Sequence, residues 1–192
     1  MLFRLDGHII DDDLDALIDL CSMIDERGAR LLAVLRDVSE ECPAHEEFDD
    51  LVGLGFVACQ RYLTQAAAAL GLDKRQALST GPKTETGQFV SEIINTAANA
   101  WKHEGEWDLV VQFDPQDDDG LHRIVGTSWT AKQAIGAKTI SAVTRILPVA
   151  AWDYKFVNFL ALLDPELRFS AVVNLLIAWR DTNLDAMSDS AS

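Results

Sequence analysis

Apolar side chains recur every three or four residues along most of this 192-residue chain, and that spacing constrains the fold more than any other feature. It matches the repeat of an α-helix, in which residues at such intervals share one face that is buried. The spacing predicts six helices, at about 11–40, 46–70, 86–103, 130–147, 150–164 and 165–184. Only the stretch WDLVVQF at 107–113 has β-like character. We therefore predict an all-α helical bundle with a long irregular loop at about 104–127, forming one domain over 1–187 with a frayed tail at 188–192.

Several of the predicted helix ends carry recognisable signals. The aspartates at 11–13 suit the positive end of a helix dipole, and capping explains them better than metal binding because consecutive helical residues point in different directions. Gly71 is expected to end its helix in the left-handed conformation. Asp164 followed by Pro165 is typical of a helix start. The segment GLGF at 53–56 lacks the flanking features of a phosphate loop, so we expect its glycines to let another helix approach closely.

The charge balance limits the classes of partner. The chain has 31 acidic and 16 basic residues, which gives a formal net charge of −15. A field of this sign repels phosphate backbones unless basic residues gather locally. The best runs along the sequence, Lys74 with Arg75 and Arg27 with Arg30, are small and flanked by acids. Nucleic-acid binding is therefore disfavoured.

The cellular compartment is indicated by the cysteines and by the apolar runs. Cys21, Cys42 and Cys59 are odd in number and sparse, which is typical of reduced thiols in a cytoplasm. The N-terminal stretch MLFRLDGHIIDDDLD does not have the form of a signal peptide. The apolar run VVNLLIAW at 172–179 is much shorter than the roughly 18 residues that span a bilayer. We expect a soluble cytoplasmic protein without membrane partners.

The predicted helix 86–103 separates its polar and apolar side chains cleanly. Its apolar side consists of Val90, Ile94, Ala97, Ala98 and Trp101, and its polar side consists of Glu92, Asn95, Asn99, Lys102, His103 and Glu106. One interpretation is an ordinary solvated face. Asparagine, however, is a mediocre helix former, and both Asn and His donate and accept hydrogen bonds. Their alignment at four-residue intervals therefore indicates a polar contact with something other than water.

The run from Asn99 to His103 resembles the end of the R-N-x-x-x-H signature of HEPN-type proteins. The resemblance implies a helical bundle, often homodimeric, of the kind common in bacterial toxin–antitoxin and phage-defence systems. In that family an arginine and a histidine meet at a dimer cleft and cut RNA without metal. Asn99 and His103 match the signature, but the arginine position is Ala98. Alanine offers no charge to a scissile phosphate, so the departure affects the activity itself.

Other chemistry finds no support in the sequence. The four histidines, His8, His45, His103 and His122, form neither of the zinc-hydrolase spacings H-x-x-x-H and H-E-x-x-H. The acidic stretch FDPQDDDG fails as a calcium loop because Pro115 and Gly126 stand where ligands belong. We expect no cofactor and no metal, and we interpret the acidic stretch as a solvated turn.

Three functions remain open. The first is an acidic, helical interaction module that self-associates or binds a protein partner, HEPN-like but without nuclease activity. The second is a metal-independent ribonuclease with His103 as its general acid–base and an arginine from elsewhere, such as Arg123. The third is an antitoxin-like or immunity-like partner whose negative surface covers a basic protein. The candidate catalytic residue is His103, and the candidate interface residues are Asn95, Asn99, Lys102, Glu92, Glu106, Trp101 and Trp107.

Overall fold

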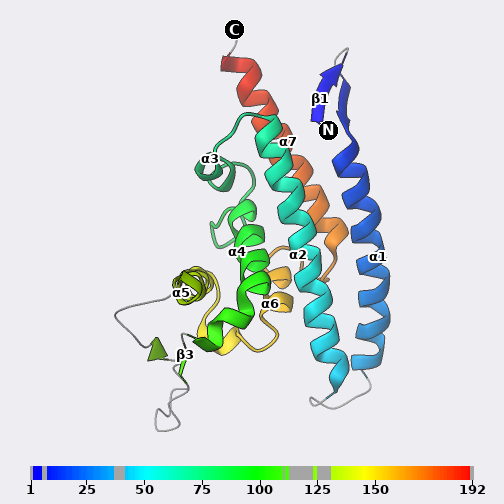
Figure 1. The fold of residues 1–192 in the computed structure, drawn as a ribbon. Helices are drawn as coiled ribbons and strands as arrows, with labels where there is room; N and C mark the ends of the chain where they lie inside the picture. Colours follow the sequence, from blue (N-terminus) through cyan, green and yellow to red (C-terminus); the bar gives the residue numbers. More distant parts are fainter. Residues whose placement is uncertain are drawn as a thin grey trace.

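The computed structural model of the chain confirms the all-α class (Figure 1). It describes residues 2–5, 8–36, 42–109, 111–112, 123–124 and 131–190. The described residues form the α-helices α1 (Asp12–Leu35), α2 (Pro43–Ala69), α3 (Lys74–Leu78), α4 (Val90–His103), α5 (Ala131–Thr144), α6 (Lys155–Ala161) and α7 (Phe169–Ser190). Two 3-10 helices, η1 (Glu104–Leu109) and η2 (Val149–Ala151), accompany them. Two antiparallel pairs complete the elements: β1 (Leu2–Leu5) with β2 (His8–Asp11), and β3 (Val111–Gln112) with β4 (Arg123–Ile124).

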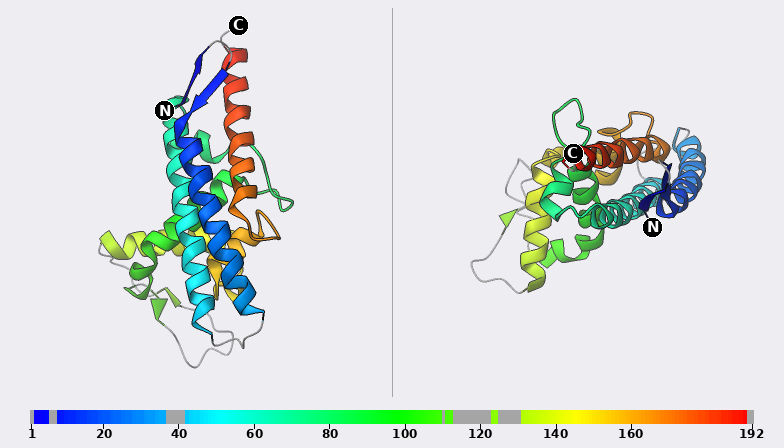
Figure 2. Two further views of the ribbon diagram at one scale, coloured as in Figure 1. Left: turned by 90° about the vertical axis from the view of Figure 1, so that its right-hand side faces the viewer. Right: turned by 90° about the horizontal axis from the view of Figure 1, so that it is seen from above.

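Three long helices give the molecule its length. Helices α1, α2 and α7 run alongside one another, and α4 packs on α2 (Figure 1). Helix α5 lies across α4 on the side away from α1, as the view from above shows (Figure 2). The strands β1 and β2 stand beside the C-terminal end of α7 (Figure 2). Helix α4 therefore lies between the long helices and α5.

The glycines of GLGF lie where neighbouring helices come closest to α2, which confirms the interpretation of this segment. A Cβ atom on Gly53 would collide with the indole of Trp101 in α4. A Cβ atom on Gly55 would collide with the ring of Phe169 in α7. That ring packs edge-on against Phe56, with 5.4 Å between the centroids. Small residues in α2 thus let α4 and the start of α7 pack closely against different sides of this helix.

The N-terminal end of α1 is held by a buried polar network. Asp11 is the N-cap, and its carboxylate accepts a hydrogen bond from the Leu14 N–H at 3.2 Å, so the predicted capping role is confirmed. The same carboxylate accepts a hydrogen bond from Tyr62 Oη at 2.7 Å and pairs with Arg180 Nη1 at 3.0 Å. Burial and the contact with Asp11 raise the pKa of the Tyr62 hydroxyl. One aspartate therefore ties α1, α2 and α7 together.

Several predicted boundaries need correction. Gly71 does end α2 in the left-handed conformation, with φ at 65°. The segment after it, which belongs to none of the six predicted helices, contains α3, because Asp73 and Gln76 form a reciprocal capping box. Helix α4 begins at Val90 rather than 86, and the 3-10 helix η1 follows its end at His103 directly. Helix α5 ends at Thr144 rather than 147, and only Lys155–Ala161 of the predicted helix 150–164 is α-helical.

The prediction that the last helix starts at Pro165 is wrong. Asp164 accepts a hydrogen bond from the Arg168 N–H, and Leu167 has a φ of 58°, which turns the chain before the helix begins. Helix α7 starts at Phe169. Its first N–H groups, those of Phe169 and Ser170, donate to the carboxylate of Asp25 in α1 at 2.6 and 2.9 Å. The cap thus comes from another helix rather than from the preceding residues.

The remaining differences are local. Strands β1 and β2 were not expected, since each is only four residues long. Strand β3 lies inside the β-like stretch at 107–113. The predicted tail at 188–192 is helical as far as Ser190. The acidic loop at 113–120 lies outside the described residues.

Candidate functional site

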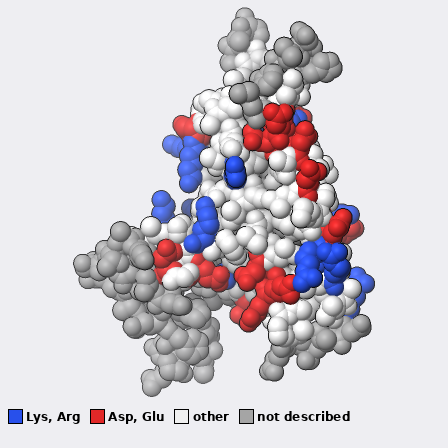
Figure 3. Space-filling view, turned by 45° about the vertical axis from the view of Figure 1, so that its right-hand side comes forward, with Lys and Arg blue, Asp and Glu red and all other residues white. Residues whose placement is uncertain are grey.

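Charged side chains do not cover the surface evenly despite the large negative total. The space-filling view shows acidic and basic groups side by side in several places, with broad uncharged areas elsewhere (Figure 3). Four basic residues that are distant in sequence, Lys74, Lys102, Lys138 and Arg145, line two adjoining cavities along α4. We call these two cavities together the α4 groove. They share Asn95, Asn99, Lys74 and Leu78 as lining residues.

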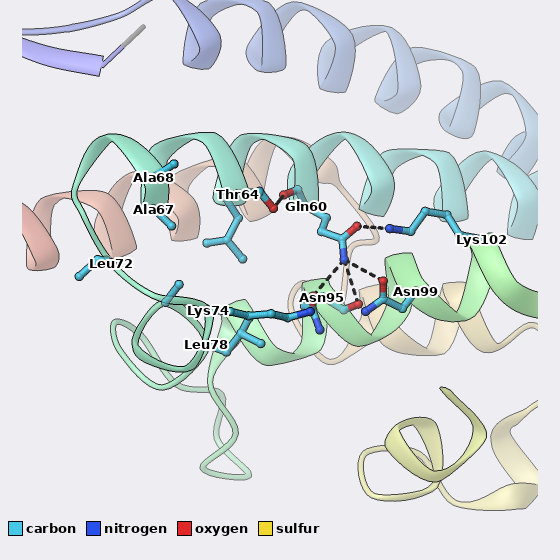
Figure 4. A pocket seen from close by; sticks show the side chains of 12 residues that line it. Gln60, Thr64, Ala67, Ala68, Leu72, Lys74, Leu78, Asn95, Asn99 and Lys102 are labelled. Carbon is cyan, nitrogen blue, oxygen red and sulfur yellow. Dashed lines mark hydrogen bonds between the residues drawn. The ribbon is translucent and has the colours of Figure 1, made fainter. Parts of the chain in front are cut away.

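The first cavity of the α4 groove lies between α2, α3 and α4 and has a volume of about 430 Å³ (Figure 4). Its two ends differ in chemistry. One end is apolar and is lined by Leu63, Ala67, Ala68, Leu72, Ala77 and Leu78. The other end is polar, with Gln60, Asn95, Asn99 and Lys102 around it and Lys74 reaching across from α3. This cavity suits a ligand that has both an apolar and a polar part.

A single glutamine of α2 organises the polar end. Lys102 Nζ donates to Gln60 Oε1 at 2.6 Å, which fixes the orientation of the glutamine amide. Gln60 Nε2 then donates to the side-chain oxygens of Asn95 and Asn99, at 3.0 and 3.1 Å (Figure 4). Because both asparagine oxygens accept from Gln60, their amide NH₂ groups remain as hydrogen-bond donors for a ligand.

The lysines at this end repel one another. Partial burial lowers the pKa of Lys102, and the charge of Lys74 lowers it further. Both lysines line the first cavity of the α4 groove. An anion bound between them would relieve this repulsion.

The second cavity of the α4 groove lies between α3, α4 and α5, with a volume of about 640 Å³. His103, Lys138 and Arg145 line it. His103 Nδ1 lies 3.1 Å from Glu106 Oε2, so the ring is held by an acid and Nε2 is its other hydrogen-bonding atom. Arg145 Nη2 lies 3.9 Å from Glu92 Oε1, an exposed pair of the kind that contributes little to stability. Its guanidinium thus keeps most of its capacity to bind an anion.

The predicted polar residues of α4 are only partly brought together. Asn95, Asn99 and Lys102 all contact Gln60. His103 instead lines the second cavity, and Glu106 contacts the histidine ring. The two tryptophans that were singled out pack against or within the core and do not line the groove. Trp101 covers Gly53, and Trp107 is buried, with its Nε1 donating to Thr139 Oγ1 at 3.0 Å.

Sequence reasoning missed four groups that the fold adds to the α4 groove: Gln60, Lys74, Lys138 and Arg145. They lie on α2, α3 and α5, and no spacing along the chain connects them. The side chain of Arg123, the suggested replacement for the missing arginine, lies outside the described residues. Arg145 is an arginine that the structure does bring to the same cavity as His103.

The alanine at the arginine position of the HEPN-type signature lies in the core. Ala98 has an exposed fraction of 0 % and belongs to the hydrophobic core. A long charged side chain at this position would be buried among apolar groups, where an unpaired charge is costly. The surroundings of Ala98 therefore suit a small apolar residue.

A second set of titratable groups lies around the start of α6. The Asp49 carboxylate accepts a hydrogen bond from the Val157 N–H at 2.9 Å, and Lys155 pairs with Glu104 nearby. Burial raises the pKa of Asp49 to about 6, although the hydrogen bond from Val157 and the charge of Lys155 act in the opposite direction. Asp49 thus joins α2 to α6. Because its carboxyl is unfavourable to ionise in this buried position, its effect on stability depends on pH.

Comparison with protein-family models, with curated proteins and with solved structures finds no match. Within the described ranges, no helix is long and apolar enough to cross a membrane. The same residues bring together no three His, Cys, Asp or Glu side chains that could hold a metal ion. The three cysteines are free thiols, with Cys21 and Cys59 buried and Cys42 partly exposed. What the fold and the groove define is a helical bundle with a polar, locally basic cavity.

Proposed function

We propose that this protein is a binding protein whose ligand carries phosphate groups and occupies the α4 groove. The observation that carries the proposal is the arrangement of donors around Gln60, which leaves the amides of Asn95 and Asn99 as donors beside Lys74 and Lys102. A phosphate accepts several hydrogen bonds at once and is stabilised by nearby cations. The whole-chain charge does not oppose this, because the field inside a cleft depends on the groups that line it.

The shape of the α4 groove supports a small ligand rather than a bare anion. Each of its two cavities, of about 430 and 640 Å³, lies in the range of roughly 300–1,000 Å³ that is usual for small-molecule sites. The apolar end can hold the uncharged body of the ligand, while Lys138 and Arg145 in the second cavity can bind a further anionic group. A nucleoside diphosphate combines these features and serves as the probe.

In this proposal the protein is HEPN-like but has no nuclease activity. The burial of Ala98 supports that form, because the position that supplies the cation in an active HEPN-type protein here packs into the core. A binding role also agrees with the charged groups that line the groove, which are cations except for Glu92, the partner of Arg145. That the protein self-associates or binds a protein partner stays a prediction.

Calorimetric titration with ADP, with pyrophosphate and with adenosine tests the proposal. We expect ADP and pyrophosphate to bind and adenosine to bind much more weakly. The double substitution Lys74→Gln with Lys102→Gln removes the two cations beside the donors around Gln60. It should weaken ADP binding by at least about tenfold, since each charged hydrogen bond is worth roughly 1.5–3 kcal/mol. Lys83→Gln, which removes a positive charge outside the groove, is the control and should change little. Binding that is absent, or unaffected by the double substitution, would overturn the proposal.

One observation favours an alternative, a metal-independent ribonuclease. His103 and Arg145 line the same cavity, and Glu106 holds the histidine ring. His103 would accept the proton of the ribose hydroxyl that attacks the phosphate and would then give a proton to the ribose oxygen that leaves it, while Arg145 would stabilise the charge on the phosphate. Incubation with total RNA beside a His103→Ala variant decides the matter. Cleavage by the wild-type protein and none by the variant would support the nuclease, and equal digestion by both would exclude this mechanism.

The third function open to the sequence, an acidic antitoxin-like or immunity-like partner, stays a prediction. Its expected sign is a basic partner whose binding weakens steeply with added salt.

A further inference from the structure

The outer side of α1 exposes apolar side chains next to a hollow between α1 and α2. Leu20 and Met23 of α1 are 43 % and 67 % exposed, and Leu54 of α2 is 48 % exposed. Together with Ile24, Leu51, Val57 and Ala58, these residues line a hollow of about 610 Å³. A contiguous group of exposed apolar side chains marks an interaction surface, whereas single scattered ones do not.

The charges on this side of α1 are ordered along the helix. Asp15 and Asp19 precede Met23, and Arg27 and Arg30 follow it. At about 100° per residue, these five positions fall within about 120° of the helix circumference, and all five side chains are exposed. We call them the α1 face. Figure 3 shows this side of the molecule, with acidic groups gathered above a basic group towards its right-hand edge.

The α1 face is complementary to itself. In a two-fold symmetric contact between antiparallel helices, a residue that precedes the axis meets the residue at the same distance after it. With Met23 on the axis, Asp19 of one copy meets Arg27 of the other, because each is four residues from the centre. Asp15 in the same way comes opposite the turn that carries Arg30. Both charge pairs then occur twice, on either side of an apolar centre.

We propose that two copies of this chain associate through their α1 faces, antiparallel, with Met23 at the two-fold axis. The proposal goes beyond the ligand-binding function, since the α1 face and the α4 groove share no lining residue. The unpaired cations favour a second copy as the occupant of this surface. Arg27 already pairs with Glu47, but Arg30 and Arg61 have no ion-pair partner within the part of the chain that the structure describes. The acidic half of another α1 supplies the carboxylates that this cationic end lacks.

The apolar centre and the charged ends have different roles in the contact. Burial of Leu20, Met23 and Leu54 removes apolar surface from water and drives association. The exposed ion pairs add little affinity, but like charges brought face to face are strongly disfavoured, so the pairs fix the antiparallel register. A parallel arrangement would place Asp19 against Asp19 and Arg27 against Arg27.

Charge exchange between the two halves of the α1 face gives a sharp test. Variant A carries Asp15→Arg and Asp19→Arg, and variant B carries Arg27→Asp and Arg30→Asp. In sedimentation velocity we expect the wild-type protein to be a dimer, and each variant alone to self-associate at least about tenfold more weakly. An equimolar mixture of A and B should form a heterodimer, because every arginine of A then faces an aspartate of B. The chain that carries all four substitutions should dimerise again with itself.

Matched controls separate the contact from changes in folding or total charge. Glu85→Arg with Asp185→Arg alters the net charge as variant A does, at exposed positions away from α1, and should leave the dimer intact. Met23→Glu should abolish it, because two carboxylates would meet at the axis. Circular dichroism checks that each variant is folded. A wild-type protein that stays monomeric at all concentrations, or variants A and B that remain dimeric alone, would overturn the proposal.

Discussion

Replacement of Asp11 by alanine should destabilise the protein more than almost any other single change near its surface. The substitution removes the N-cap of α1, the acceptor of the Tyr62 hydroxyl and the buried partner of Arg180. Breaking a buried ion pair costs about 3–5 kcal/mol, and losing a cap costs about 1 kcal/mol. Arg180 keeps a second partner, Asp181 at 2.8 Å, which reduces the penalty. We therefore expect a loss of about 4 kcal/mol.

The size of the effect is large enough for an ordinary unfolding experiment. For a protein of 150–250 residues, a change of 1 kcal/mol shifts Tm by roughly 2–4 °C, so Asp11→Ala should lower Tm by about 8–16 °C. Urea unfolding followed by circular dichroism gives the free energy directly. Asp11→Asn is the matched control. It keeps a good N-cap and an acceptor for Tyr62 but removes the charge, so its cost should lie between those of wild type and alanine.

A double-mutant cycle with Arg180→Met separates the ion pair from the rest of the network. We expect Asp11→Ala to cost less in the Arg180→Met background, because no buried cation is then left without its partner. Should Asp11→Ala cost under about 1 kcal/mol in the wild-type background, the network does not hold α1, α2 and α7 together and the reasoning fails.

Three further changes test other parts of the structure. Gly53→Ala places a Cβ against the Trp101 indole and should cost about 1–3 kcal/mol in urea unfolding; Gly105→Ala, where the added atom meets nothing within 4 Å, should be nearly neutral. Because the pKa of Asp49 is raised from 3.8 to about 6, its contribution to stability is full below about pH 4 and is lost as the pH rises through 6. Asp49→Asn should therefore raise Tm at pH 8 and leave it unchanged near pH 4, and a larger gain at acid pH would contradict this. The hydrogen bond with Cys21 and burial raise the pKa of the Cys59 thiol, so in the folded protein a thiol reagent should label Cys42 first. Cys42→Ser should abolish that fast reaction, and rapid labelling that persists would show that the buried thiols are accessible.

The helices could be predicted because each has to bury one face on its own. The three-to-four spacing marks that face wherever a helix packs against the core. It located both ends of α2 and α4 and the start of α1 to within a few residues, but it extended α1 to 40 and missed both ends of α7. Gly71 and the GLGF segment were predictable for a different reason: glycine at a helix end or inside a helix has few structural explanations.

The boundaries that failed depend on contacts between distant residues. Asp164 and Pro165 form a local start signal, but the cap of α7 is Asp25, which lies in α1 and leaves no trace near residue 169. In α3, five residues of helix depend on the capping box of Asp73 and Gln76 rather than on an apolar face. Local rules lose to tertiary contacts in both cases.

The candidate site was predictable in one half only. The four-residue spacing of Asn95 and Asn99 indicated a polar partner, and the structure supplies Gln60 in that role. The partner itself could not be inferred, because Gln60 lies on another helix, 35 residues from Asn95. The basic character of the α4 groove was hidden for the same reason. Its cations come from α3, α4 and α5, and no short stretch of the sequence holds more than one of them.

The capping of α7 by Asp25 makes the stability of one helix depend on the presence of another. Two amide groups at the start of α7 are satisfied only when α1 is docked, so α7 cannot reach its full stability as an isolated segment. Fluctuations that detach α1 therefore loosen the start of α7 as well, and the two helices open together as one cooperative unit. Exchange of the Phe169 and Ser170 amide hydrogens with solvent is thereby coupled to the motion of α1.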